Sequence, residues 1–560
     1  MRKAPRTLVE ALSQLPRGDA RGFRFIGADG QERYFPYEQL ILEATRRAGL
    51  LAQAGVRKGE RVALVIPEGH EFVLTFLGAV IAGAVPVPIF PRATFKATND
   101  YTSSVAHIAE ASDCRLLVAM ESNLALVAPV RDALPSLARI ATTEALFAPT
   151  LHALFTPPAV EPDDLCFLQF TSGSTARPKG VMVTHGNLVA NATAFLGPDG
   201  LDRRDDDIGV SWLPLYHDMG LIGFILGPLI VDIPVVILPT ASFARGPKIW
   251  LETISRVRGT ITYAPNFAYA LAVKRLKQRD LDALDLSCLR IAGCGAEPIH
   301  ADTLRAFARA LAPAGFRDDA LLPSYGMAES TLAITFHRQG TPLRVDRVDP
   351  VALRAARAVS STADDAIDIV SCGVPFPGHA LAVRDEHGAA LPERHVGEVV
   401  ARGPSVTPGY FRNDEANADT FTTDGFLRTG DLGYIAEGDL FVCGRSKDLI
   451  IIRGANFHPQ DLEWAVSELE GVRRGNVVAF GTQLDGDEKL VLVLECTSTD
   501  VQAVCARVAA RITESFGLTP HEVVGVTLGS LPKTSSGKVQ RRKTRDLYLG
   551  GQLERHPTTP

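Results

Sequence analysis

The sequence predicts an α/β protein in which a large N-terminal part, built on parallel sheets covered by helices, precedes a small α+β C-terminal part. The chain has 560 residues, too many for one hydrophobic core. In residues 1 to about 160, short apolar strands alternate with helical patterns, such as the helix predicted over 37–54 and the strand predicted over 61–67. A parallel sheet with helices on both faces produces this alternation.

Composition excludes several classes of protein. The net charge of −6 gives no basis for a nucleic-acid partner. The eight cysteines include no CxxC pair, so buried reduced thiols in a cytoplasmic protein are a better interpretation than a zinc site or a disulfide framework. Residues 72–90 carry no charge, but Gly83, Pro86 and Pro88 interrupt them, which predicts a buried helix followed by a strand. Residues 1–12 lack the apolar segment of a signal peptide, and we expect no stable membrane insertion.

A stretch rich in hydroxylated side chains, FTSGSTARPKG at 170–180, lies between apolar segments that are each predicted to be a strand. Glycine and short hydroxylated residues let backbone N–H groups and hydroxyls approach phosphate oxygens, and Lys179 adds a positive charge. In a Walker loop the lysine is followed by Ser or Thr and a helix, whereas here Gly180 and Val181 follow it. The pattern favours a different kind of phosphate loop over a Ser/Gly-rich surface turn.

Two further stretches follow predicted strands. The turn SWLPLYHDMG at 211–220 places His217 before an apolar helix, where it is a candidate for lining a pocket or for a structural role. The segment GCGAEP at 293–298 predicts a glycine turn and a helix that begins at Glu297-Pro298. No GxGxxG fingerprint is present, so a Rossmann dinucleotide site is not indicated. Small residues there would let a flat ring pack against the backbone.

Two acidic residues lie in polar turns. In SYGMAEST at 324–331, Tyr325 offers a stacking face and Glu329 is a hard oxygen ligand suited to Mg²⁺ that bridges phosphates. In LRTGDLG at 427–433, Asp431 could accept hydrogen bonds from two ribose hydroxyls. Taken alone, Glu329 is better explained as a solvated residue of an ordinary turn, and a turn-forming aspartate is the alternative interpretation of Asp431.

The second half of the chain changes character. Residues 354–368 are rich in Ala, Arg and Asp and predict an inserted or mobile surface segment. Alternating strands and turns then predict a β-rich subdomain. The polar stretch 444–448 between two apolar strands predicts a domain boundary, and the residues after it have their own βα pattern. The tail 531–542 is a Ser/Gly loop with lysines, either functional or a solvated basic tail.

Taken together, these stretches resemble the adenylate-forming superfamily of acyl-CoA synthetases, nonribosomal adenylation domains and luciferases. The resemblance covers about residues 30–545 and rests on the joint match of TSGSTARPKGV, SYGMAEST, LRTGDLG, GRSKDLIII and PKTSSGKVQRR. Within the superfamily the likeness is greatest to fatty acyl-AMP ligases, through WLPLYHDMGLIG, PNFAY, GAEP, RGPSVTPGY and RGANFHPQDLE. The sequence departs at Ala176, where relatives commonly have glycine, and alanine disfavours the positive φ that a mobile loop uses.

The resemblance implies a domain plan. The AMP-binding N-terminal domain would span 1–443, including a β-rich subdomain at about 369–443. An extra segment of the kind that such ligases carry after the SYGMAES-type motif would occupy about 338–370. A hinge at 444–447 would connect to a mobile C-terminal domain at 448–560.

The resemblance also assigns roles to residues. The ATP phosphates would be bound by Thr171, Ser172, Gly173, Ser174, Thr175 and Lys179. Glu329 would ligate Mg²⁺, and the adenine cleft would be formed by Gly295, Ala296, Glu297 and Tyr325, with further cofactor contacts from Gly326, Met327 and Ala328. Asp431 and Arg445 would hold the ribose, and His217 would line the acyl site. Lys447 would lie at the hinge, and Lys538 would be the catalytic lysine.

The implied activity is that of a fatty acyl-AMP ligase. It would activate a medium- or long-chain fatty acid with ATP and pass the acyl group to an acyl carrier protein or to a carrier domain of a polyketide or nonribosomal peptide synthase. A fatty acyl-CoA synthetase is the alternative enzyme. A non-catalytic nucleotide- or lipid-binding protein is the alternative of another class, and the presence of Lys538, Glu329 and Asp431 argues against it.

Overall fold

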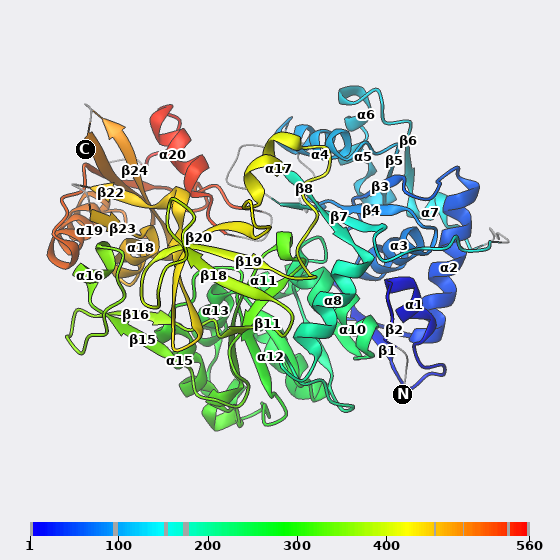
Figure 1. Ribbon diagram of the computed structural model, residues 1–560, viewed down its shortest axis with the longest axis horizontal. Helices are drawn as coiled ribbons and strands as arrows, with labels where there is room; N and C mark the ends of the chain where they lie inside the picture. The colour runs from blue at the N-terminus through cyan, green and yellow to red at the C-terminus, as the bar shows by residue number, and fades with distance from the viewer. Residues whose placement is uncertain are drawn as a thin grey trace.

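The computed structural model describes residues 4–92, 99–149, 155–171, 178–452, 455–484, 487–534 and 538–556. Figure 1 shows the N-terminal half of the chain on one side of the molecule and the C-terminal end on the other. Within the described ranges, no helix is both long enough and apolar enough to cross a membrane.

The largest sheet is parallel through its centre and antiparallel at its edges. Its strand order, as far as the chain is described, is β17 (Val374–Pro375), β14 (Ala333–Phe336), β13 (Leu321–Gly326), β12 (Ile291–Cys294), β11 (Ile261–Ala264), β9 (Gly209–Ser211), β10 (Val235–Ile237), β1 (Gly22–Ile26) and β2 (Glu32–Pro36). Its parallel centre agrees with the predicted fold class of parallel sheets covered by helices.

Helices cover both faces of this sheet. On β11, Thr262 accepts a hydrogen bond from the Trp250 indole, which belongs to α12 (Lys248–Val257). The next residue, Tyr263, points to the opposite face and packs against Phe224. The face with Trp250 is covered by α12, α13 (Asn266–Arg275) and α15 (Ala301–Leu311). The face with Tyr263 is covered by α1 (Leu8–Ser13), α8 (His185–Leu196) and α10 (Gly227–Val231).

A second, fully parallel sheet lies in the N-terminal part. Its order is β4 (Val85–Pro88), β3 (Arg61–Leu64), β5 (Leu116–Ala119) and β6 (Arg139–Thr142). Helix α2 (Tyr37–Gln53) packs against α3 (Gly69–Ile81), whose residues 72–81 are all buried. The uncharged run 72–90 is therefore a buried helix followed by strand β4, as predicted.

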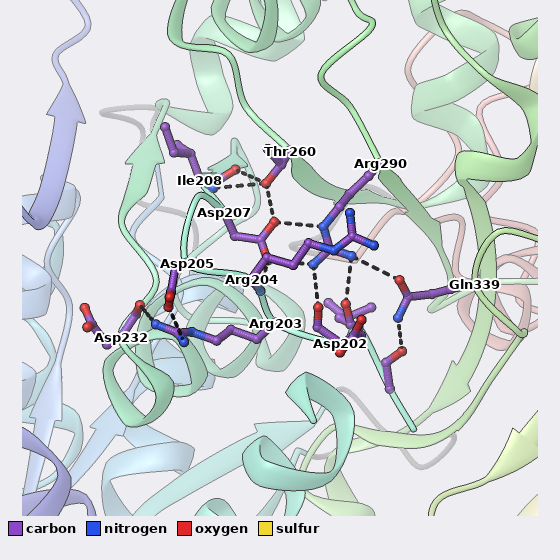
Figure 2. Close-up of polar contacts among 12 residues, drawn as sticks. Asp202, Arg203, Arg204, Asp205, Asp207, Ile208, Asp232, Thr260, Arg290 and Gln339 are labelled. Atoms are coloured by element: carbon purple, nitrogen blue, oxygen red, sulfur yellow. Dashed lines mark hydrogen bonds and ion pairs between the residues drawn. The ribbon is translucent and has the colours of Figure 1, made fainter. Parts of the chain in front are cut away.

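The base of the large sheet is stabilised by a buried ion pair (Figure 2). Asp207, which precedes β9, accepts hydrogen bonds from Arg290 Nε and Nη2 at 2.8 and 2.6 Å and from Thr260 Oγ1 at 2.7 Å. Thr260 and Arg290 precede β11 and β12, so the three residues tie together the amino ends of adjacent parallel strands. Arg290 also donates to the Leu201 carbonyl and to Gln339. The opposite, carboxyl ends of the same strands are left for the functional site.

The predicted β-rich region contains an antiparallel sheet of order β18 (Ala380–Arg384), β19 (Gly397–Arg402), β20 (Leu427–Ala436) and β21 (Asp439–Arg445). The segment before it is more regular than the sequence indicated. Strands β15 (Val345–Val348) and β16 (Ile367–Val370) pair antiparallel, and α16 (Pro350–Arg354) lies between them. Residues 354–368 therefore belong to an inserted strand pair and its connection.

The C-terminal part packs its own core. Its elements are β22 (Ile450–Ile452), β23 (Ala455–Phe457), α18 (Pro459–Ser467), β24 (Val472–Leu484), β25 (Asp487–Cys496), α19 (Val501–Phe516), β26 (Glu522–Val526) and α20 (Arg541–Leu549). As far as the chain is described, the hydrophobic clusters of this part contain only residues after 449. The domain boundary at 444–447 stays a prediction that this packing favours.

Candidate active site

The predicted site residues come from elements far apart in the sequence and line one cleft between the two parts of the chain. His217 follows β9, residues 295–297 follow β12, and Tyr325 lies at the end of β13, all at the carboxyl ends of parallel strands. The cleft is lined by Thr171, Lys179, His217, Gly295, Ala296, Glu297, Tyr325, Gly326, Met327, Ala328, Glu329, Asp431, Arg445, Lys447 and Lys538. The sequence could name these residues, but only the fold brings them together.

The phosphate loop connects two strands, as predicted. Strands β7 (Leu165–Thr171) and β8 (Lys179–Thr184) pair antiparallel, with Thr171 opposite Lys179. The pairing brings the two ends of the loop together at the cleft. The remaining predicted phosphate contacts and the variant position lie outside the described residues, namely Ser172, Gly173, Ser174, Thr175 and Ala176.

Glu329 is buried and is held by Tyr410. The Tyr410 hydroxyl donates a hydrogen bond of 2.6 Å to Glu329 Oε1, and the Thr407 amide donates to the Glu329 carbonyl at 2.8 Å. The Lys179 ammonium lies 5.0 Å from the centre of the Tyr410 ring, a cation–π contact. Burial raises the pKa of Glu329, and the Tyr410 hydrogen bond opposes that rise. Tyr410 therefore links the predicted phosphate lysine to the predicted metal ligand.

This arrangement suits a magnesium ion that is shared with phosphates. The described residues contain no group of three or more His, Cys, Asp or Glu side chains that could enclose a metal ion. One buried carboxylate that shares the Tyr410 ring with the predicted phosphate lysine instead matches the way Mg²⁺ is held by one or two carboxylates together with substrate phosphates.

Asp431 is buried between two partners. Its Oδ2 accepts a hydrogen bond of 2.6 Å from the Tyr325 hydroxyl, and its Oδ1 lies 3.1 Å from Arg445 Nε across the β20–β21 ladder. Burial raises the pKa of Asp431, while the adjacent Arg445 favours the charged carboxylate. The ring of Tyr325 is thereby fixed at the cleft, next to a carboxylate that can accept further hydrogen bonds.

Glu297 has a different structural role from the one predicted. The helix after the glycine turn is α15, which begins at Ala301 rather than at Glu297-Pro298. The Glu297 carboxylate instead accepts a hydrogen bond of 2.8 Å from the Phe267 amide, in the first turn of α13. Glu297 thereby satisfies an orphan amide of a neighbouring helix and does not begin a helix of its own.

Lys538 reaches this segment from the C-terminal part. Its Nζ donates a hydrogen bond to the carbonyl of Ala296, which has a φ of +69°. Burial lowers the pKa of Lys538, and the nearby carboxylates of Glu297 and Asp218 oppose that effect. Lys538 is not part of a detached basic tail: its side chain lies within the cleft.

His217 pairs with a half-buried carboxylate, Asp218, that the sequence had not singled out. His217 Nδ1 lies 2.6 Å from Asp218 Oδ1. Burial alone would raise the pKa of Asp218, but His217 and Lys538 hold it below its ordinary value. Asp218 was visible in the sequence only as the neighbour of His217, and its closeness to Lys538 depends on the whole fold.

The cleft continues from His217 into an apolar wall. The predicted helix at 221–226 is largely a π-helix (Ile222–Leu226), a form often found at functional sites. Phe224 and Phe336 both contact the ring of Tyr263, at centroid distances of 6.5 and 5.9 Å. A side chain at Gly293 would collide with that ring, so this glycine is required by packing.

Lys447 lies in a short turn (Ser446–Asp448) directly after β21, and its side chain is exposed. Ser446 Oγ donates a hydrogen bond of 3.0 Å to the Gly430 carbonyl, which holds the start of the turn against the Asp431 loop. The hinge role of Lys447 stays a prediction.

The chain is similar to known proteins along most of its length. The model of the family described as AMP-binding enzyme matches residues 17–411. A putative acyl-CoA synthetase of Caulobacter vibrioides is 38% identical over 553 residues, which cover 97% of this chain and 96% of that protein. The medium-chain fatty acid–acyl-carrier-protein ligase JamA of Moorena producens is 33% identical over 532 residues, 91% of this chain and 89% of JamA.

A solved structure also superposes on this chain, with a TM-score of 0.92. It comes from structural and functional studies of fatty acyl-adenylate ligases from E. coli and L. pneumophila. It is 35% identical and the match covers 97% of this chain and 98% of that one.

Proposed function

The chain belongs to the AMP-binding enzyme family, and on that premise we propose that it is a fatty acyl-AMP ligase. It joins a medium- or long-chain fatty acid to AMP at the expense of ATP and then transfers the acyl group to the phosphopantetheine thiol of a carrier protein or carrier domain. The observation that carries the proposal is the placement of Lys538 in the cleft that also holds Lys179, Glu329 and Asp431.

In the first step, a carboxylate oxygen of the fatty acid forms a bond to the α-phosphorus of ATP, and the bond from that phosphorus to pyrophosphate breaks. Reactions of this class depend on positioning and charge neutralisation. Asp431 and Arg445 would hold the ribose, Tyr325 would pack on the adenine, and Lys179 with the β7–β8 loop would bind the phosphates. Mg²⁺, held by Glu329, would neutralise charge on the phosphate oxygens.

Lys538 would act on the reacting atoms. Its ammonium lies beside Ala296 and near Asp218, between the predicted adenine cleft and the apolar wall. A positive charge at this position can stabilise the charge that develops between the carboxylate and the α-phosphate. His217, paired with Asp218, would orient the carboxylate end of the fatty acid at the entrance to the apolar wall.

In the second step, the thiol sulfur attacks the acyl carbonyl, a thioester forms, and AMP leaves. We propose that the C-terminal part rotates about Lys447 and removes Lys538 before this step. The carrier acceptor is supported by the similarity to JamA, whose description is that of an acyl-carrier-protein ligase.

A fatty acyl-CoA synthetase is the second candidate, favoured by the description of the Caulobacter relative. The inserted segment at 338–370 supports the carrier-dependent ligase instead. The guanidinium carbon of Arg354, in this segment, lies 4.9 Å from the centre of the Phe457 ring of the C-terminal part. Such a contact would resist the rotation, and docking of a carrier protein can supply binding free energy to overcome it that the much smaller coenzyme A cannot.

The two candidates are separated by supplying ATP and a fatty acid to the purified protein, with coenzyme A in one reaction and a holo carrier protein in the other. The proposal expects acyl-AMP in both and acyl transfer chiefly to the carrier. We further propose a cytoplasmic location, since the cysteines are free thiols, which suits a reducing compartment.

A further inference from the structure

Arg541, the first residue of α20, contacts two carboxylates from separate elements. Its Nη1 lies 2.5 Å from Asp448 Oδ2, in the predicted hinge turn. Its Nη2 lies 2.8 and 3.0 Å from the two carboxylate oxygens of Glu463 on α18, and its Nε donates to the same group at 3.2 Å. Glu463 also accepts a hydrogen bond from the Ala479 amide on β24. The guanidinium thus joins the hinge turn, α18 and the start of α20.

Lys538 lies only three residues before Arg541, in the second of two short segments, 531–534 and 538–540, that pair with each other as the Lys538 hairpin. Lys533 and Val539 form an antiparallel bridge, and the Gln540 amide donates to the Pro532 carbonyl at 2.8 Å. The Lys538 amide donates to Thr534 Oγ1 at 3.1 Å. Leu531 and Val539 pack against the core of the C-terminal sheet and hold the two segments to it. Arg541 is the side chain that also joins them to the hinge turn and to α18.

We propose that Arg541, Asp448 and Glu463 form a clamp that aims the Lys538 hairpin into the cleft, so that Arg541 is a positioning residue for the first step. The inference rests on the proposed function, because the role of Lys538 does. Arginine suits this task because its planar fork can bind two carboxylates at once, whereas the lysine ammonium is a point charge that cannot reproduce that geometry.

The three side chains stay partly accessible to solvent, with exposed fractions of 23%, 27% and 17% for Arg541, Asp448 and Glu463. Ion pairs that keep contact with water contribute little to the free energy of unfolding. The main effect of the clamp is therefore expected on the placement of Lys538 rather than on stability.

The clamp also lies entirely on the C-terminal side of Lys447. A rotation about Lys447 would carry Arg541, Asp448 and Glu463 together, so the clamp is kept in both orientations. Because Lys538 acts only in the first step, loss of the clamp should slow acyl-AMP formation and leave thiol transfer unchanged. A purely structural ion pair would affect both steps alike.

The test is Arg541→Lys in the full-length protein, with Arg545→Lys as the matched control. Arg545 is one turn further along the same helix, and its ion pair with Asp546 is long, at 3.8 Å. The rate of pyrophosphate release reports the first step, and acyl transfer from preformed acyl-AMP to a holo carrier protein reports the second. A thermal melt reports stability.

A misplacement of a reacting group by about 1 Å costs on the order of 100-fold in rate, so Arg541→Lys should lower kcat of the first step by about 10- to 100-fold. Thiol transfer, the KM for ATP and the melting temperature should match the wild type. Asp448→Asn and Glu463→Gln, which each remove one charge of the clamp, should show smaller losses of the same kind.

The inference is overturned if Arg541→Lys forms acyl-AMP at the wild-type rate, if both steps fall equally, or if Arg545→Lys shows the same loss. Where Arg541→Lys fails to fold, the two carboxylate variants decide by the same criteria. A wild-type protein that forms no acyl-AMP would overturn the proposed function itself, and this inference with it.

Discussion

The hydrogen bond between Tyr410 and Glu329 offers a sharp test of how the site is built. Tyr410→Phe removes the hydroxyl that lies 2.6 Å from Glu329 Oε1 but keeps the ring beneath Lys179. Tyr410→Leu removes both the hydrogen bond and the cation–π contact. The two variants therefore separate the two functions of one side chain.

The size of the effect follows from the contact. A hydrogen bond to a charged group contributes about 1.5–3 kcal/mol. At about 1.4 kcal/mol per tenfold change, its loss corresponds to roughly 10- to 150-fold in the rate of acyl-AMP formation. Losing the contact between Lys179 and the ring adds about 0.5–2 kcal/mol, so Tyr410→Leu should be slower than Tyr410→Phe.

The assay is pyrophosphate release under saturating fatty acid, together with the free energy of unfolding from denaturant titration. The matched control is Tyr434→Phe, because the Tyr434 hydroxyl donates a comparable bond of 2.8 Å to Asp346 away from the cleft. The control should lose stability and keep the rate per folded enzyme. Wild-type activity in Tyr410→Phe, or an equal loss of activity in Tyr434→Phe, would refute the reasoning.

Three further predictions concern catalysis, stability and pH. Lys538→Ala should slow pyrophosphate release by about 100- to 1000-fold and leave acyl transfer from preformed acyl-AMP intact. Lys533→Ala serves as the control for a solvated charge, and an equal loss in both steps would contradict the catalytic role of Lys538. Asp207→Asn should lower the free energy of unfolding by about 3 kcal/mol, because it removes the buried carboxylate that is the countercharge of the half-buried Arg290. A melt that matches the wild type would disprove this. Burial raises the pKa of Asp461 to about 7, above its unfolded value, so the free energy of unfolding should fall as pH rises from about 4 to 7. Asp461→Asn should flatten this dependence of the free energy of unfolding on pH, and an unchanged dependence would show that another group is responsible.

Much of the fold followed from local signals. Helix α2, predicted over 37–54, spans Tyr37–Gln53 in the structure because its apolar face repeats with the helical period. The two strands predicted on either side of the phosphate loop are present as β7 and β8 and pair antiparallel, with Thr171 opposite Lys179. The motif residues could be placed at strand ends, and parallel strands bring those ends to one edge of the sheet.

Other features depend on contacts that no local pattern encodes. Tyr410 belongs to a motif that the sequence displayed, but its role arises from pairing with the Val181 strand and the Glu329 turn. Glu297 was expected to begin its own helix, yet it binds an amide of α13. Strands β15 and β16 were not predicted because each is only four residues long and neither alternates regularly, and the Ala- and Arg-rich connection between them carries no periodic signal.

The central claim is that the protein makes acyl-AMP and reserves the acyl group for a carrier protein. The most direct measurement follows the products of wild-type protein, ATP, Mg²⁺ and a long-chain fatty acid, with coenzyme A or a holo carrier protein as the acceptor. The account predicts that acyl-AMP accumulates in the presence of coenzyme A and that the carrier protein becomes acylated. Efficient formation of acyl-CoA would contradict it and identify the protein as a fatty acyl-CoA synthetase.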